Sequence, residues 1–206
     1  MTRPPLPYGA VILGAGASSR MGRAKLLLPW GATTVIGHII SIWRELGASQ
    51  IAVVQRNNDL ALAVELDRLE FPQSNRITNP YPERGMFSSI LCAANWDGWH
   101  AALKSFAILL GDQPHLRLET LRGLVSFHSE HPSAVCQPEF QGRARHPVFL
   151  PQEIFYELKR SEAETLKDFL KLIPRSAVQY PVDDASLSLD LDTPEDYIDA
   201  MTRFSA

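Results

Sequence analysis

Short apolar runs rich in β-branched residues alternate along the chain with segments whose apolar residues recur at helical spacing. In the segment 34–46, Ile36, Ile40 and Trp43 lie four and three positions apart, which places them on one face of a helix. The pattern predicts strands at 8–13, 51–54, 76–78, 106–110, 134–137, 147–150 and 177–181, and helices at 34–46, 59–69, 86–95, 118–127, 152–159 and 163–172, with a closing helix after Thr193. Strands that alternate with helices imply a mostly parallel sheet covered on both faces, so the sequence predicts a Rossmann-like, three-layer α/β/α fold.

Residues with capping roles mark several of the predicted helix ends. Asp59 stands where an N-cap belongs, and Gly47 stands where a C-cap glycine belongs. Thr193, Pro194 and Asp196 have the order of a capping box, with proline at the first helical position. These residues indicate where the helices begin and end.

Length and composition indicate one domain over residues 1–206, with residues 1–7 expected to form a flexible tail. Hydrophobic residues make up 45% and charged residues 21% of the chain, which is ordinary for a globular protein. A net charge of −3 indicates neither a nucleic-acid footprint nor a basic membrane surface, and no run of about 18 apolar residues exists. The two cysteines, Cys92 and Cys136, lack the spacing of a metal site or a disulfide framework, so a reducing cytoplasm is the default compartment.

The loop after the first predicted strand has an unusual composition. Ligands of parallel sheets bind beyond the carboxyl ends of the strands, so the residues there are the informative ones. Between Gly14 and Lys25 the chain is rich in glycine, alanine and serine and carries the cations Arg20, Arg23 and Lys25. Glycines allow a tight turn whose successive N–H groups can surround an anion, and the cations add fixed positive charge. The loop therefore predicts a phosphate-binding site.

Two other phosphate-binding loops do not fit. A P-loop needs Lys followed by Ser or Thr after its second glycine, whereas Gly22 is followed by Arg23. The dinucleotide fingerprint needs a third small residue where Ser19 stands, and an acidic residue after the second strand, which ends in Gln55-Arg56. A dinucleotide-dependent oxidoreductase is therefore disfavoured. A solvated turn with incidental basic residues is the remaining alternative.

Carboxylates follow two later segments and predict a metal site. Asp112 comes directly after the clearest predicted strand, 106–110, where Gly111 lets the backbone bend. Asp190 and Asp192 lie two positions apart, so in an extended chain they face the same side. Oxygen ligands of this kind suit Mg²⁺, which takes one or two protein carboxylates together with phosphate oxygens and water.

Five motifs occur in a fixed order along nearly the whole chain. They are Leu13-Gly-Ala-Gly16 with Ser18-Ser-Arg-Met-Gly22, Lys25 and Leu27-Leu-Pro29; Asn79-Pro80 with Gly85-Met-Phe-Ser-Ser89; Leu110-Gly-Asp-Gln-Pro114; His146-Pro147; and Asp190-Leu-Asp-Thr-Pro-Glu-Asp196. The chain resembles the nucleotidyltransferases that activate sugars and pterins, and most closely the molybdenum cofactor cytidylyltransferase branch of the MobA-like NTP transferases.

The resemblance implies transfer of CMP from CTP to the terminal phosphate of the molybdopterin cofactor, with release of pyrophosphate. It implies Mg²⁺ as cofactor, held by Asp112 and Asp192, because the residue before Thr-Pro-Glu-Asp is the usual second ligand in related enzymes. Arg20, Lys25 and Asp112 are then the expected catalytic residues. The expected nucleotide-binding residues are Leu13, Gly14, Ala15, Gly16, Ser18, Ser19, Arg20, Lys25, Asn79 and Asp112. A molybdoenzyme client or its chaperone is an expected partner.

The choice of base rests on the start of the loop. Guanylyl-transferring relatives usually carry Gly-Gly there, whereas this chain has Ala15-Gly16, which resembles the cytidylyl pattern. A bulkier residue at position 15 leaves less room for a purine and agrees with CTP over GTP. Asn79 is expected to contact base or ribose, although an Asn before proline is equally typical of a turn.

The acceptor site is expected around Ser88, Ser89 and His146. Ser88 and Ser89 open a predicted helix whose free N–H groups can receive a pterin phosphate, although a helix start with a satisfied serine explains them equally well. His146 is singled out by the resemblance, because a lone histidine is more often structural. The family usually has Gly before this His-Pro pair, whereas this chain has Arg145, so the acceptor can differ.

Several alternatives stay open. A guanylyltransferase for the same cofactor and a cytidylyltransferase for a small sugar or alcohol phosphate would use the same chemistry. A non-catalytic molybdopterin-binding chaperone would keep the fold, but it would not need the metal carboxylates. Metal-dependent pyrophosphate release distinguishes the enzymes from the chaperone.

Overall fold

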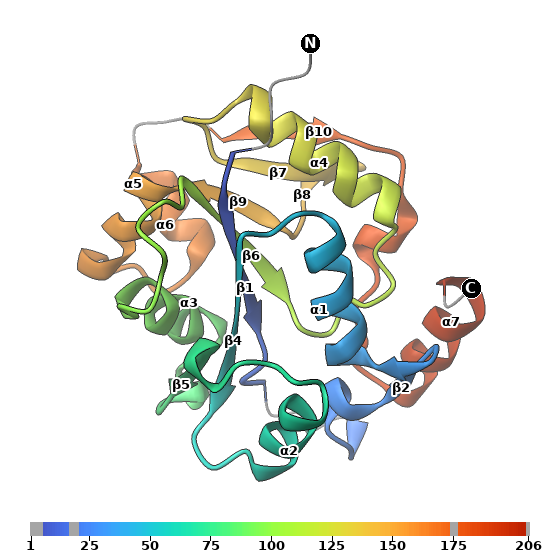
Figure 1. Ribbon diagram of the computed structural model, residues 1–206. Helices are drawn as coiled ribbons and strands as arrows, with labels where there is room; N and C mark the ends of the chain where they lie inside the picture. The colour runs from blue at the N-terminus through green and yellow to red at the C-terminus, as the bar shows by residue number, and fades with distance from the viewer. Residues whose placement is uncertain (1–5, 17–20, 174–176, 205–206) are drawn as a thin grey trace.

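A computed structural model describes residues 6–16, 21–173 and 177–204, and these form one eight-stranded sheet and a two-stranded hairpin (Figure 1). Along the sheet the order is β10-β7-β9-β6-β1-β4-β5, with β8 paired to β7. The strands are β1 (Tyr8–Leu13), β4 (Gln50–Arg56), β5 (Arg76–Asn79), β6 (Ser105–Leu110), β7 (Cys136–Phe140), β8 (Arg143–Ala144), β9 (Val148–Pro151) and β10 (Val178–Pro181). The α-helices are α1 (Val35–Glu45), α2 (Leu60–Arg68), α3 (Met86–Asn95), α4 (Leu118–Glu130), α5 (Gln152–Glu157), α6 (Leu166–Leu172) and α7 (Pro194–Phe204).

The sheet is mostly parallel, as the sequence predicts. β1 pairs in parallel with both β4 and β6, β4 pairs in parallel with β5, and β7 pairs in parallel with β10. β9 runs antiparallel between β6 and β7, and the short β8 is antiparallel to β7. The carboxyl ends of β1, β4, β5 and β6 therefore share one edge of the sheet, which is where ligands of such folds bind.

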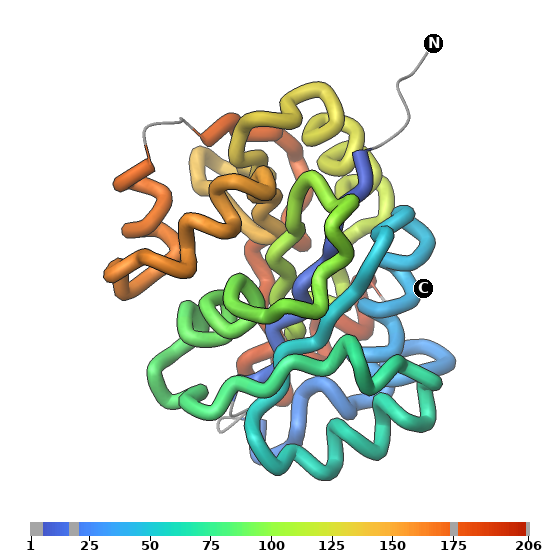
Figure 2. Tube along the Cα trace, turned by 60° about the vertical axis from the view of Figure 1, so that its left-hand side comes forward, coloured from blue at the N-terminus to red at the C-terminus, as the bar shows by residue number. Residues whose placement is uncertain are grey.

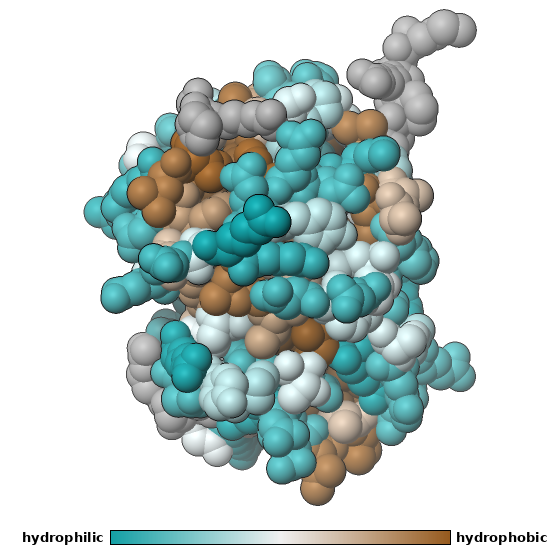
Figure 3. Space-filling model, turned by 90° about the vertical axis from the view of Figure 1, so that its left-hand side faces the viewer, coloured by the Kyte–Doolittle hydropathy of each residue, from teal (hydrophilic) through white to brown (hydrophobic). Residues whose placement is uncertain are grey.

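Helices cover both faces of the sheet, which confirms the three-layer prediction. Side chains of successive strand residues point to opposite faces, so Ala10 and Ile12 pack with α1, α2, α4 and α7, whereas Val11 packs with α3, α5 and α6. Figure 2 shows α5 and α6 on the same side of the chain as α3. Figure 3 looks onto that side of the molecule, where hydrophilic side chains gather across the middle.

The capping residues have their predicted roles. The Asp59 side chain accepts a hydrogen bond from the N–H of Leu62 at 3.2 Å, and Gly47 has a φ of 82°. Thr193 Oγ1 accepts from the N–H of Asp196 at 3.2 Å, and Asp196 accepts from the N–H of Thr193 at 2.8 Å. This reciprocal pair is a capping box, and it fixes where α7 begins.

Some boundaries differ from the predicted ones. The predicted helix 163–172 begins at Leu166, because the side chain of Thr165 caps it by accepting from Asp168 N at 3.1 Å. After β7, a turn at Gln141-Gly142 leads into the short β8, a strand that the sequence pattern does not predict, and not directly into β9. Both turn residues have positive φ, 51° and 72°, as in a two-residue hairpin.

The N-terminal segment and the lengths of the helices are two further features of the fold. Most of the expected tail, residues 1–5, lies outside the described residues, but the carbonyl of Pro7 accepts from the N–H of Lys104 at 2.8 Å. Among the helices of the described ranges, none is both long and apolar enough to cross a membrane.

His128 is a titratable residue of α4 that is buried between this helix and the sheet. Its side chain is 1% exposed, its ring stacks on Phe149 with centroids 4.6 Å apart, and its Nε2 lies 2.8 Å from Ser105 Oγ. Burial lowers the pKa of His128 to about 4, because the positive form cannot be hydrated there. The folded protein therefore resists protonation of this ring, whereas the unfolded chain takes up the proton near pH 6.5.

We predict that acid destabilises the protein through His128. Because the folded-state pKa is depressed, the stabilising contribution is complete above pH 6.5 and is lost as the pH falls towards 4, a change of about 3 kcal/mol. Urea denaturation as a function of pH measures it. His128→Gln should flatten the profile between pH 6.5 and 4, whereas the exposed His100→Gln should leave it unchanged. Equal profiles for both variants would contradict the assignment.

Candidate functional site

A cleft of about 280 Å³ lies beyond the carboxyl ends of the parallel strands. The start of the glycine-rich loop forms one wall, the residues after β6 form the floor, and the start of α3 closes the other side. Its lining residues are Leu13, Gly14, Ala15, Gly16, Lys25, Leu26, Pro82, Gly85, Met86, Ser89, Leu110, Gly111 and Asp112. Six of the residues that the sequence predicts for a nucleotide site, Leu13, Gly14, Ala15, Gly16, Lys25 and Asp112, therefore line one cleft. The predicted Ser18, Ser19 and Arg20 lie outside the described residues.

Glycines let the backbone of the loop pass close to the neighbouring strands. Gly14 N–H donates to the carbonyl of Val54 at 2.7 Å, and Gly111 N–H donates to the carbonyl of Leu13 at 3.1 Å. A Cβ at Gly111 would lie 2.6 Å from that Leu13 carbonyl oxygen, which is backbone and cannot swing away. Position 111 therefore requires glycine for Asp112 to follow β6 at this place.

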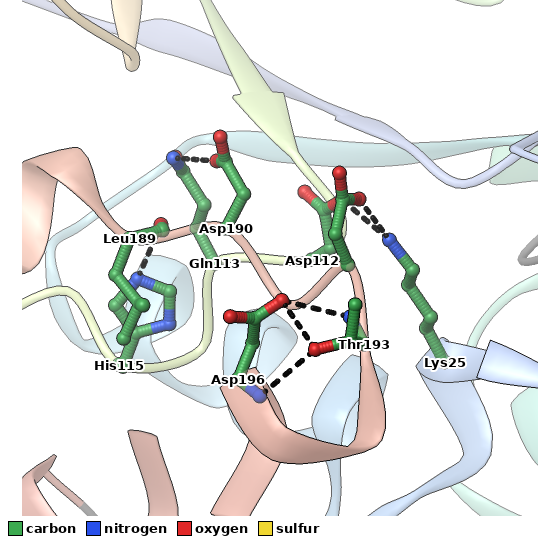
Figure 4. A network of polar contacts seen from close by, with 9 residues as sticks. Lys25, Asp112, Gln113, His115, Leu189, Asp190, Thr193 and Asp196 are labelled. Atoms are coloured by element: carbon green, nitrogen blue, oxygen red, sulfur yellow. Dashed lines mark hydrogen bonds and ion pairs between the residues drawn. The ribbon is translucent and has the colours of Figure 1, made fainter. Parts of the chain in front are cut away.

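Lys25 lies between two carboxylates that are far apart in sequence. It begins a short 3-10 helix, η2 (Lys25–Leu27), ahead of the hairpin strands β2 (Pro29–Trp30) and β3 (Thr33–Thr34). Its Nζ lies 2.7 Å from Asp192 Oδ1 and 3.4 Å from Asp112 Oδ2, as Figure 4 shows for the lysine and Asp112. The lysine side chain is 12% exposed, so this ion cluster is partly desolvated. The sequence predicts all three residues for the site, and the structure brings them together.

Burial dominates the electrostatics of Asp112. Desolvation raises the pKa of Asp112, and the nearby charge of Asp190 raises it further, while the Lys25 ammonium and the backbone N–H of Asp112 itself oppose the rise. Carboxylates gathered in a partly desolvated cleft are stabilised by positive charge. The cleft is therefore suited to a cation or to the cationic side chain that it holds here.

Asp190 and Asp192 do not lie in an extended chain, contrary to the sequence expectation. The N–H of Asp192 donates to the carbonyl of Asp190 at 2.9 Å, which turns the chain between them. The two carboxylates consequently have different partners. Asp190 Oδ1 accepts from Gln113 Nε2 at 2.9 Å, whereas Asp192 contacts Lys25. Only Asp192 joins the lysine cluster directly.

Gln113 and His115 position this turn, and the sequence does not single them out. His115 is buried, and its Nε2–H donates to the carbonyl of Leu189 at 2.9 Å, as Figure 4 shows. The same Nε2–H also donates to the carbonyl of Ser186 at 3.2 Å. Burial lowers the pKa of His115, which keeps the ring neutral. Together the two side chains tie the loop after β6 to the segment before α7. The only sequence signal was their nearness to Asp112.

Asn79 makes the contacts of a turn residue. It is fully buried, and its Nδ2 donates to Ser88 Oγ at 2.8 Å and to Ser89 Oγ at 2.9 Å. Its Oδ1 accepts from the N–H of Tyr81 at 2.9 Å. These bonds hold β5 against the start of α3, as expected of the turn-forming alternative.

The three expected acceptor residues do not share one cleft: Ser89 lines the first cleft, His146 lines a second one, and Ser88 lines neither. Ser89 lines the cleft described above, whereas Ser88 Oγ donates to the carbonyl of Gly85 at 2.7 Å at the start of α3. His146 lines a second cleft, and its Nδ1–H donates to the carbonyl of Ile108 at 3.3 Å. Burial lowers the pKa of His146. Met86 lines both clefts, so they adjoin.

The residues present can hold a divalent cation if other ligands complete its shell. Among the described residues no three His, Cys, Asp or Glu side chains form a metal-binding group. Asp112 and Asp192 nevertheless share one cationic partner, Lys25. Mg²⁺ commonly uses only one or two protein carboxylates together with phosphate oxygens and water, and this pair fits that pattern.

Fold and site define an α/β protein with a cleft at the carboxyl edge of its sheet, where the start of a glycine-rich loop lies close to Lys25 and its two carboxylate partners. The MobA-like NTP transferase domain matches residues 10–180 of the chain, and the protein belongs to this family of nucleotidyltransferases. The predicted family is therefore confirmed.

Known relatives show how far the similarity extends. The molybdenum cofactor cytidylyltransferase of Escherichia coli (strain K12) is 26% identical over 200 residues, 95% of this chain and 96% of the relative. A molybdenum cofactor guanylyltransferase of Mesorhizobium japonicum is 28% identical over 140 residues, 68% of this chain and 64% of the relative. A crystal structure of Rv0371c from Mycobacterium tuberculosis H37Rv has a TM-score of 0.73 at 24% identity, covering 97% of this chain and 100% of that chain. Its complex with manganese has a TM-score of 0.69 at 21% identity, covering 96% and 99%.

We predict that Gly111→Ala lowers the free energy of unfolding by about 1–3 kcal/mol, because the new methyl group overlaps the Leu13 carbonyl. Urea denaturation measures the loss. Gly16→Ala is the matched control in the same cleft, since a Cβ there meets no atom of the described residues within 4 Å, and we expect a change within about 0.5 kcal/mol. If both variants lose the same free energy of unfolding, the close approach of the Leu13 carbonyl is not the reason that position 111 requires glycine.

Proposed function

We propose that this protein transfers CMP from CTP to the terminal phosphate of the molybdopterin cofactor and releases pyrophosphate. The bridging of Asp112 and Asp192 by Lys25, in a cleft walled by the glycine-rich loop, is the observation that carries the proposal. Family membership and similarity to the Escherichia coli cytidylyltransferase over 95% of the chain support it. A cytoplasmic location suits the proposal.

The reaction needs binding and charge neutralisation more than acid–base catalysis. An oxygen of the acceptor phosphate attacks the α-phosphorus of CTP, a new P–O–P linkage forms, and the bond from that phosphorus to the leaving pyrophosphate breaks. A phosphate monoester is already anionic near neutral pH, so no strong base is required. The protein's task is to align the two phosphates and to stabilise the charge that develops on the leaving group.

Each proposed site residue has a role in this scheme. The N–H groups of the loop at Ala15 and Gly16 bind the triphosphate, while Gly14, whose N–H is bonded to Val54, lets the loop start close to β4. Lys25 with Arg20 stabilises the departing pyrophosphate. Asp112 and Asp192 hold Mg²⁺, which would share the negative charge of the phosphate oxygens in the transition state. The manganese complex of Rv0371c, a protein of the same fold, agrees with a divalent cation.

The preference for CTP rests on Ala15. Its side chain is 5% exposed and lines the first cleft, so it occupies volume that a glycine would leave open. A narrower cleft suits a pyrimidine better than a purine. A guanylyltransferase is the second candidate, because the Mesorhizobium japonicum relative shares 28% identity over 140 residues. A non-catalytic carrier of the cofactor has no need for the Lys25 cluster.

We predict that CTP binds with Mg²⁺ more tightly than GTP does, and that Asp112→Asn weakens the binding at least about tenfold because a cation ligand is lost. Isothermal titration calorimetry with each nucleotide, with and without Mg²⁺, measures this. Asp97→Asn is the control: Asp97 is exposed beside Gly98, whose carbonyl is held by Gln50 at the opposite edge of the sheet.

The possible outcomes separate the candidates. If GTP binds more tightly than CTP, the assignment of cytosine as the base is wrong, but the proposed nucleotidyl transfer still holds. If neither nucleotide binds, or if binding is indifferent to Mg²⁺ and to Asp112, the transferase proposal is wrong and the carrier takes its place.

We predict that Lys25→Met strengthens Mn²⁺ binding about tenfold in the absence of nucleotide, because an ammonium no longer competes for the two carboxylates. The same variant should weaken triphosphate binding. Electron paramagnetic resonance of free Mn²⁺ measures the first effect and calorimetry the second. Arg23→Met removes a cation from the same loop and should not raise the Mn²⁺ affinity. Unchanged or weaker Mn²⁺ binding in Lys25→Met would refute this competition.

A further inference from the structure

A second cleft, of about 740 Å³, adjoins the first and is larger. It lies between the β7–β8 hairpin and α6, and Met86 at the start of α3 lines both clefts. Its lining residues are Met86, Gln137, Gly142, Arg143, Ala144, Arg145, His146, Val148, Thr165, Leu166, Lys167, Leu170, Lys171 and Ala177.

The lining of the second cleft is cationic although the chain as a whole carries a net charge of −3. Among the described residues that line it, four are lysine or arginine and none is aspartate or glutamate. Lys171 is paired with Asp168 at 2.8 Å. Over the described ranges, Arg143, Arg145 and Lys167 form no ion pair, so their charges are available to an anion.

Arg145 carries a buried donor without a partner. Its Nε is shielded from solvent and makes no hydrogen bond to any part of the chain that the structure describes. Its backbone N–H donates to the carbonyl of Pro138 at 2.8 Å, which fixes its position. A buried, unpaired N–H is unfavourable, and such groups are rare in native proteins unless they serve a ligand. An anion bound at this guanidinium would satisfy the group.

The two arginines lie on or directly after an ordered hairpin, whereas Lys167 lies on α6. Arg143 pairs with Phe140 across the β7–β8 ladder, and the Gln141-Gly142 turn that joins them has the left-handed conformation of a tight two-residue loop. Apolar side chains, among them Val148 and Leu166, line the rest of the cleft. The cleft therefore combines a cationic rim with apolar surface.

We propose that the second cleft binds the body of the acceptor, and that the acceptor is a partly apolar molecule with an anionic group besides the phosphate that attacks CTP. Arg143, Arg145 and Lys167 bind this second anionic group, and the attacking phosphate reaches the first cleft past Met86. The assignment rests on the proposed nucleotidyl transfer. It places acceptor specificity on the hairpin and α6, away from the nucleotide loop.

Inorganic phosphate is the probe, and backbone amide chemical shifts in nuclear magnetic resonance are the readout. In the wild type we expect saturable shifts at Gly142, Ala144 and Thr165. The double variant Arg143→Gln/Arg145→Gln should weaken this binding about tenfold or more. Shifts at Gly14 and Gly111 report phosphate in the first cleft and should be unaffected.

The matched control is Lys159→Gln/Arg160→Gln, which removes two cations outside both clefts and should leave the shifts at Gly142 and Ala144 in place. Undiminished binding in the hairpin variant, or equal loss in the control, would overturn the proposal. So would the absence of saturable shifts in the wild type.

Nucleotide binding by the same proteins separates this proposal from the proposed function. The hairpin variant should bind CTP with Mg²⁺ as the wild type does, and in transfer to molybdopterin it should raise the KM for the acceptor while leaving the KM for CTP unchanged. If the wild type binds no nucleotide, the transferase proposal fails, while the phosphate titration still decides whether the second cleft binds anions. A raised KM for CTP alone would overturn the assignment to the acceptor.

Discussion

The parallel register of β1 with β6 is the constraint on which the first cleft depends. It sets Leu13 opposite Leu110, so the loop after β1 and the residues after β6 leave the sheet side by side. The bond from Gly111 N to the Leu13 carbonyl continues that pairing one step beyond the strands. Asp112 consequently faces the glycine-rich loop, and a slip of one residue would turn its carboxylate away.

Charge balance links the two ends of the chain at this edge. Lys25 and Asp192 are 167 residues apart, yet their contact at 2.7 Å brings the segment after β1 to the start of α7. Gln113 and His115 hold the same C-terminal segment from the strand side. The ion cluster is thus a tertiary contact as well as a feature of the cleft, because it holds the segment before α7 against the segment after β1.

The sequence predicts what depends on local patterns and misses what depends on distant contacts. Seven strands of the sheet, the helix caps at Asp59 and Thr193, and six of the residues that line the first cleft follow from periodicity and from residues that come directly after strands. The short strands β2, β3 and β8 are not predicted. The turn between Asp190 and Asp192 does not, because its shape is set by Gln113 from another element. The second cleft also escapes prediction, since its walls come from segments that no single motif spans.

β9 is reversed relative to both β6 and β7, with Val148 opposite Ile108 near the edge where the parallel strands end. β9 therefore begins at this edge of the sheet, whereas its neighbours β6 and β7 end there. Arg145 and His146 lie in the segment between β8 and β9, outside the parallel ladder that β1 forms with β4 and β6. Insertions or substitutions in that segment can remodel one half of the binding edge while the hydrogen-bonded ladder that carries the other half stays intact, so the two halves can diverge independently between related proteins.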